Sequence, residues 1–167
     1  MTEPVFATLD GFASEVPLER FGRIRRLDLV AEARKMLGTP FVHRGRLAGV
    51  GSDCVGVAAL PMLALGMIVP DVADYDRYSA GTALPTQLRK IAWPIPIDAA
   101  KPGDAIVFPH LSIRSRAERR EEHFAWKVSF GRILQAWDAS KGVVETEFDA
   151  RWRRRAVAAY HLAEVEP

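Results

Sequence analysis

The chain has one cysteine, Cys54, and it is the residue best placed to do covalent chemistry. It lies in residues 51–57 (GSDCVGV), where a glycine-bearing loop runs into an apolar segment. A cysteine in the first turn of a helix faces unpaired backbone N–H groups and the positive end of the helix dipole, and both favour the nucleophilic thiolate. Gly56 would leave one side of the sulfur open. The same context suits a buried apolar cysteine equally well.

A nucleophilic cysteine needs a base within hydrogen-bond reach and a group that orients the base. The chain has four histidines, which are His43, His110, His123 and His161. His123 opens a predicted hairpin, with strands at 123–129 and 132–137 joined by a turn at Phe130-Gly131. Pairing across this turn would bring Gln135 beside His123, where its amide oxygen could accept an imidazole N–H. An amide carries no charge, so it should stabilise the imidazolium less than a carboxylate would.

The remaining polar residues are weaker candidates. His110 follows a proline and is expected in a surface loop, and His161 is expected to be a partly buried structural residue in the last strand. Asp71, Asp74 and Asp76 belong to a turn-rich segment and are expected to be solvated. A single cysteine cannot supply a zinc site of the Cys/His type, and no P-loop or dinucleotide fingerprint is present, so no metal or cofactor is expected.

Helical patterns fill the first half of the chain and strand patterns the second. Helices are predicted at 27–37, 53–67 and 84–91, and strands at 105–108, 123–129, 132–137, 143–148 and 156–165. Ser52 or Asp53 would cap the second helix, and Pro61 would kink it. A tight turn is predicted at 101–104, and residues 111–122 should form a polar loop or surface helix. This order predicts an α+β domain, with helices packed on an antiparallel sheet.

The composition suits one compact domain over residues 1–167, with residues 1–26 as an N-terminal extension. Hydrophobic residues make up 49% of the 167, charged residues 26%, and the formal net charge is +2. This balance argues against a nucleic-acid binder. Basic clusters at 23–26, 114–120 and 151–155 are expected to be solvated surface, or else contacts with an anionic polymer or a partner. The apolar run at 55–69 is too short to span a membrane, and the N-terminus lacks a secretory pattern, which predicts synthesis in the cytoplasm.

Several motifs in order resemble those of the NlpC-type cell-wall peptidase family. They are residues 33–41 (ARKMLGTPF), residues 53–56 (DCVG), residues 102–104 (PGD) and a histidine, His123, that opens a hairpin. Residues 43–46 (HRGR) and the later pattern from Trp152 to Tyr160 resemble the phage-type branch of that family. The resemblance extends over roughly residues 27–162.

The resemblance implies a reduced papain-like fold and hydrolysis of an amide bond in peptidoglycan stem peptides, commonly the bond between D-γ-glutamate and a diamino acid, without a cofactor. Cys54 would be the nucleophile, His123 the general base and then acid, and Gln135 the third catalytic residue. The family most often has histidine at this third position. It usually has tyrosine where this chain has His43, which could still donate to the oxyanion. Asp53 is a further candidate for the oxyanion or substrate-binding region.

Two other functions remain compatible with the same residues. The protein could be a structural component of a phage tail or phage-like particle with little or no activity, in which case its partners would be tail proteins. Alternatively, the same Cys/His site could serve an amidase or acyltransferase that acts on another substrate.

Overall fold

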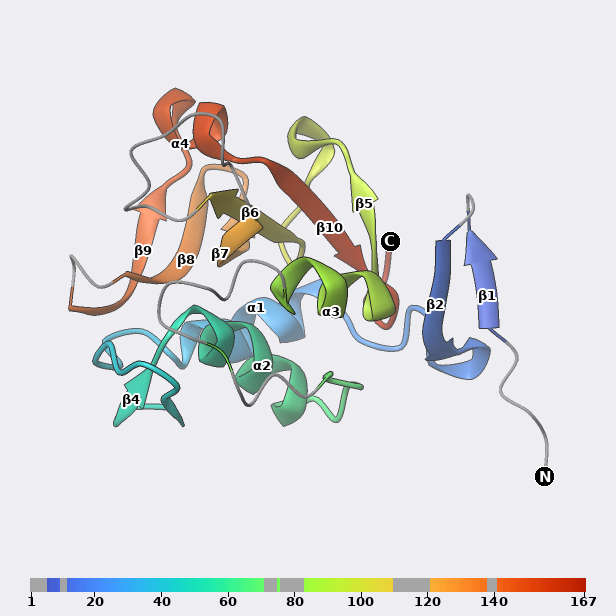
Figure 1. The fold of residues 1–167 in the computed structure, drawn as a ribbon, viewed down its shortest axis with the longest axis horizontal. Helices are drawn as coiled ribbons and strands as arrows, with labels where there is room; N and C mark the ends of the chain where they lie inside the picture. Colours follow the sequence, from blue (N-terminus) through green and yellow to red (C-terminus); the bar gives the residue numbers. More distant parts are fainter. Residues whose placement is uncertain (1–5, 10–11, 71–74, 76–82, 110–120, 138–140) are drawn as a thin grey trace.

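The computed structural model describes residues 6–9, 12–70, 75, 83–109, 121–137 and 141–167, and these form an α+β structure (Figure 1). The helices are α1 (Arg26–Arg34), α2 (Cys54–Ala64), α3 (Ala83–Ile91) and α4 (Ala150–Arg155). The longer strands are β1 (Phe6–Leu9), β2 (Phe12–Pro17), β5 (Ala92–Ile95), β6 (Ala105–Pro109), β7 (Glu121–Ser129), β8 (Arg132–Trp137), β9 (Gly142–Glu147) and β10 (Ala158–Leu162). Two short strands, β3 (Arg46–Leu47) and β4 (Gly51–Ser52), pair in the loop before α2.

A six-stranded antiparallel sheet in the order β5-β10-β6-β7-β8-β9 forms the centre of the molecule. The hairpin β7–β8 lies inside the sheet, between β6 and β9, and carries both His123 and Gln135. Because both of these strands have a paired neighbour on each side, the two side chains are held on a fixed backbone. This arrangement confirms the predicted fold class.

Helices α1, α2 and α3 cover one face of the sheet, and α4 lies beyond the other face (Figure 1). Alternate residues of a strand point to opposite faces, and the core divides in the same way. Phe124 and Trp126 of β7 pack in the cluster that contains Val57 of α2, whereas Ala125 packs in the cluster that contains Trp152 of α4. The catalytic candidates on β7 therefore lie between two packed layers.

Most of the predicted helices and strands are present, but several begin or end at other residues than predicted. Helix α1 stops at Arg34 and α2 stops at Ala64, each shorter than predicted, because a turn leads into a glycine in the left-handed region at Gly38 and Gly66. The turn at 101–104 is confirmed, with the Asp104 N–H donating to the Lys101 carbonyl at 3.1 Å. The last strand begins only at Ala158, after α4.

The sequence did not predict β5, the hairpin β1–β2, the short pair β3–β4 or helix α4. Strand β5 contains Pro94, which is tolerated because β5 is an edge strand. The hairpin β1–β2 falls in the segment that showed no clear periodicity, and α4 is only six residues long. Predictions for Asp71, Asp74, Asp76, His110 and residues 111–120 lie outside the described residues. Within the described part of the chain, no helix is both long and apolar enough to cross a membrane.

Candidate active site

Cys54 is the first residue of α2, and Asp53 caps this helix as predicted, its Oδ1 accepting from the Gly56 N–H at 3.0 Å. The helix is fastened to β7 by the Trp126 indole, which donates to the Val57 carbonyl at 2.8 Å. The Cys54 thiol in turn lies near the backbone of Phe124, the residue that follows His123, and this backbone acts to lower the pKa of the thiol. The nucleophile candidate is therefore brought to the start of the strand that carries the base candidate.

His123 and Gln135 are in direct contact, as the hairpin predicted. His123 Nε2 lies 2.8 Å from Gln135 Oε1, and the Gln135 Nε2 donates to Thr146 Oγ1 at 3.2 Å. Both residues are buried. The ladder pairs Leu134 with Trp126, which places Gln135 diagonally across from His123 on the same face.

This contact fixes the tautomer of the histidine. An amide oxygen only accepts hydrogen bonds, so His123 Nε2 carries the proton in the pair. In a neutral imidazole the other nitrogen, Nδ1, is then the acceptor. Gln135 thus orients the ring and leaves Nδ1 as the nitrogen that can take up a proton.

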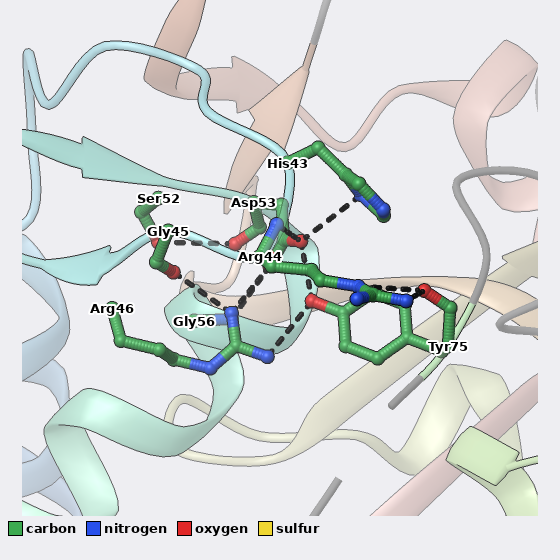
Figure 2. A network of polar contacts seen from close by, with 8 residues as sticks. All are labelled: His43, Arg44, Gly45, Arg46, Ser52, Asp53, Gly56 and Tyr75. Carbon is green, nitrogen blue, oxygen red and sulfur yellow. Dashed lines mark hydrogen bonds and ion pairs between the residues drawn. The ribbon is translucent and has the colours of Figure 1, made fainter. Parts of the chain in front are cut away.

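Asp53 is the centre of a polar network in front of α2 (Figure 2). Its Oδ2 accepts from the Arg44 backbone N–H at 2.7 Å and from the Tyr75 hydroxyl, and its Oδ1 accepts from Arg46 Nη1 at 2.9 Å besides Gly56. Each oxygen thus has two donors from the protein. In the structure Asp53 acts as a helix cap and holds the loop at 43–46. Its part in the oxyanion or substrate-binding region stays a prediction.

His43 lies at the edge of this network. Its Nδ1 is 3.7 Å from Asp53 Oδ2, its ring meets the Tyr75 ring edge-on at 5.4 Å, and its side chain is 29% exposed. The exposed part of the ring is available to a bound molecule. The role of His43 as an oxyanion donor stays a prediction.

Tyr75 is the residue of this region that sequence reasoning missed. Its hydroxyl bonds to Asp53 and accepts from Arg46 Nη2 at 2.8 Å, while its carbonyl accepts from Arg44 Nε and Nη2 at 3.0 and 2.8 Å. Burial, together with its bond to Asp53, raises the pKa of Tyr75, so the phenol stays protonated. The chain has histidine where the family resemblance calls for tyrosine, and a tyrosine from another segment packs against that histidine.

Gly56 and Gly45 allow the loop at 43–46 to press against the helix. A Cβ on Gly56 would lie 2.4 Å from Ser52 Oγ and 2.5 Å from the Gly45 carbonyl oxygen. The sequence prediction that Gly56 opens a path to the sulfur is therefore wrong, because this position faces the loop.

We expect Gly56→Ala to lower the free energy of unfolding by about 3 kcal/mol, because the added Cβ would clash with the Gly45 backbone carbonyl as well as with the buried Ser52 hydroxyl. Denaturant unfolding measures this. Gly131→Ala is the matched control, since a Cβ there meets nothing within 4 Å. Equal destabilisation by the two variants would contradict the close packing of loop and helix.

The surroundings of Cys54 favour the protonated form of its thiol. Burial, and next the negative charge of Asp53, raise the pKa of Cys54 to about 12, although the Phe124 backbone and the Arg46 charge act in the opposite direction. The sequence predicted a lowered pKa from the helix N-terminus, and this is wrong because desolvation outweighs that effect. A base must therefore accept the thiol proton when the sulfur attacks.

No group of three or more His, Cys, Asp or Glu side chains in the described part of the chain could hold a metal ion. The site as described has the groups for acyl transfer: a thiol at a helix start and an oriented imidazole.

Comparison with known proteins gives matches among solved structures only. No protein-family model matches the chain, and no curated protein matches it. A protein from Staphylococcus aureus described as similar to a lipoprotein of the NLP/P60 family aligns over 99% of this chain with 18% identity and a TM-score of 0.60. This chain spans 46% of that protein, so it corresponds to about half of its length.

Two further structures match the chain over most of its length. The NlpC/p60 domain of the peptidoglycan hydrolase SagA aligns over 82% of this chain and 98% of its own, with 21% identity and a TM-score of 0.56. The peptidoglycan hydrolase RipB from Mycobacterium tuberculosis aligns over 85% of this chain and 66% of its own, with 16% identity and a TM-score of 0.60. At these identities the likeness establishes the architecture, and the chain has the papain-like α+β fold of NlpC/P60 proteins.

Proposed function

We propose that the protein is a cysteine peptidase that hydrolyses an amide bond in peptidoglycan stem peptides. The observation that carries the proposal is the contact between His123 and Gln135 at 2.8 Å, together with the position of the Cys54 thiol near the backbone of Phe124, the residue that follows His123 on β7. Thiol, base and orienting group are the three parts that nucleophilic catalysis by cysteine requires. The substrate class is supported by the shared fold, since SagA and RipB are described as peptidoglycan hydrolases.

The reaction follows from the tautomer of His123. Nδ1 accepts the thiol proton as the sulfur attacks the amide carbon, and the carbonyl oxygen becomes an oxyanion. His123 then gives the proton to the departing amine, which leaves a thioester on Cys54. Water attacks the thioester, again with help from His123, and the acid product and the free thiol are released.

The oxyanion would meet the backbone N–H of Cys54, since the first N–H groups of a helix have no partner within it. His43 is the second candidate donor because its side chain is 29% exposed and lies beside Asp53, at the same helix start. Asp53 contributes indirectly by holding the loop at 43–46 on α2.

The biological setting is also a proposal. The resemblance of residues 43–46 and of the Trp152–Tyr160 region to the phage-type branch supports a phage or phage-like particle that acts on the cell wall, with tail proteins as possible partners. In this setting the chain would be made in the cytoplasm and carried on the particle.

The direct test is digestion of purified peptidoglycan by the pure protein, with the products identified by mass spectrometry. New stem-peptide fragments are the expected result, and their masses identify the bond that is cut. No fragments from a folded protein would overturn the proposal.

Gln135→Ala should reduce turnover roughly tenfold to a hundredfold, because the residue orients the base without transferring a proton. The structure explains the modest size of the effect, since Gln135 contacts only the far nitrogen of His123. Thr146→Val is the matched control: it removes the next hydrogen bond in the chain and should cost less. A loss with Gln135→Ala as large as that with Cys54→Ala, in a folded protein, would contradict these roles.

A second candidate is favoured by the raised pKa of the Cys54 thiol. A resting thiol that keeps its proton is also what an inactive structural component of a particle would have. An amidase or acyltransferase would use the same residues. Peptidoglycan digestion distinguishes the proposed peptidase from an inactive structural component. A screen of soluble amide substrates with added amine acceptors distinguishes it from an amidase or acyltransferase.

A further inference from the structure

The arginines of the described residues differ in whether carboxylates neutralise them. Arg20 and Arg23 share Glu164, Arg25 pairs with Asp28, Arg26 with Asp104, and both Arg34 and Arg132 with Glu145. The basic cluster at 23–26 that the sequence pointed out is therefore balanced within the protein.

The cluster on α4 is not balanced in this way. Arg151 and Arg154 are exposed and have no ion pair within the described part of the chain. Arg153 reaches Asp98 at 3.3 Å, but the Asp98 side chain is 88% exposed. A pair this open to water contributes little attraction, so the positive charge of α4 remains available to a ligand.

The helix fixes the backbone positions from which these cations extend. The Asp149 carboxylate caps it, accepting from the Trp152 N–H at 2.9 Å, and the buried Trp152 packs on the sheet. Arg151 and Arg154 are three residues apart, so they lie on one face. Arg155 lies over the Trp152 ring at 5.4 Å, which keeps its guanidinium beside them.

Lys127 adds a further cation behind the helix. Its Nζ donates to the Phe130 carbonyl at 3.1 Å and lies 4.8 Å from the centre of the Phe148 ring, which Arg153 also covers at 5.3 Å. Burial, and next the charge of Arg153, lower the pKa of Lys127. An anion bound near α4 would relieve this repulsion between neighbouring cations.

The α4 surface is connected to the candidate active site through the core. The Phe108 ring lies 5.3 Å from that of Trp152 and 6.2 Å from that of His123. The Phe108 side chain thus lies between Trp152, which packs α4 on the sheet, and His123. A long ligand held at α4 would keep the protein close to its substrate.

We propose that the array formed by Arg151, Arg153, Arg154 and Arg155 binds a phosphodiester-linked anionic polymer attached to the cell wall. The proposal rests on the proposed function, which places the protein at peptidoglycan. Guanidinium groups match phosphate oxygens in geometry and stay charged at every relevant pH, and a row of them suits a repeating anion. Binding there would retain the enzyme on the wall between cleavage events.

The test measures binding without cleavage. A Cys54→Ala protein is sedimented with insoluble wall fragments, either intact or stripped of phosphodiester polymer with hydrofluoric acid. The patch variant is Arg151→Gln/Arg154→Gln. The matched control is Arg25→Gln/Lys35→Gln, which removes the same charge from exposed, internally paired positions.

We expect tight, salt-sensitive binding to intact walls and weak binding to stripped walls. The patch variant should lose roughly tenfold or more in affinity, because each basic residue near an anionic surface contributes separately, while the control should stay within about twofold. Equal losses in both variants, or equal binding to stripped walls, would overturn the proposal. So would tighter binding to a single-stranded oligonucleotide than to intact walls.

The digestion assay keeps this proposal separate from the proposed function. Cleavage by the patch variant of a soluble stem peptide at the parent rate, with lost wall binding, is the expected pattern. If the parent protein digests walls normally but does not bind their polymer, the proposed peptidase activity stands and the proposed polymer site is overturned. No digestion despite polymer binding would overturn the peptidase instead.

Discussion

Replacing Cys54 with alanine abolishes stem-peptide cleavage, with a fall in turnover of at least about a thousandfold, if the sulfur forms the covalent bond to the substrate. The two neighbouring polar residues are engaged within the protein: Asp53 accepts from four donors, and the buried Ser52 hydroxyl donates to the Asp53 carbonyl at 3.1 Å. The measurement is the rate of fragment release from peptidoglycan, followed by mass spectrometry.

The control for this variant is folding. Alanine removes one sulfur atom from the first turn of α2 and leaves the Asp53 cap in place, so the unfolding transition should change little. Cleavage that survives in folded Cys54→Ala would show that the thiol is not the nucleophile, and the assignment of the whole site would fail.

His123→Ala should reduce turnover by about a hundredfold to ten thousandfold, the range for loss of a general base. The effect should be large here because the Cys54 thiol keeps its proton near neutral pH. Without an acceptor, that proton has to pass to water before the sulfur can attack. The initial rate of fragment release at neutral pH measures the loss.

The buried position of His123 requires a second readout, because the alanine variant leaves a cavity beside Gln135. Free imidazole added to His123→Ala should restore part of the activity by occupying that space and accepting the proton. The same addition to Cys54→Ala should restore nothing. Rescue that is equal in both variants, or absent in a folded His123→Ala, would argue against the role of general base.

Contacts between candidate site residues could be predicted from the sequence where the residues are close together along the chain. Asp53 caps the helix that begins at Cys54 because the two residues are adjacent at a loop-to-helix junction. The contact between His123 and Gln135 was predicted from the hairpin, but its geometry also depends on an irregularity next to the turn. Ser129 pairs with Arg132 and Lys127 with Ile133, and this register shift brings Gln135 to the face of His123. The order of helical and strand patterns along the chain thus predicted the fold class, and the hairpin pattern predicted that Gln135 would orient His123.

The interactions that were missed depend on long-range packing. Tyr75 reaches Asp53 across 22 residues from a segment that read only as turns. Strand β5 contains a proline, and α4 is too short for its period to stand out. The direction of the Cys54 pKa was wrong for the same reason, since desolvation depends on how α2 and β7 pack together.

A thiol that keeps its proton is also oxidised more slowly than a thiolate. Peroxide and other oxidants react with the thiolate, and the first product, a sulfenic acid, is converted to irreversible acids by further oxidation. Because burial and Asp53 hold Cys54 in the thiol form, the resting protein should lose activity to oxidants slowly. The protein contains no second cysteine that could reverse such damage within the chain. Resistance to oxidation before substrate arrives is thus built into the packing of its only sulfhydryl group.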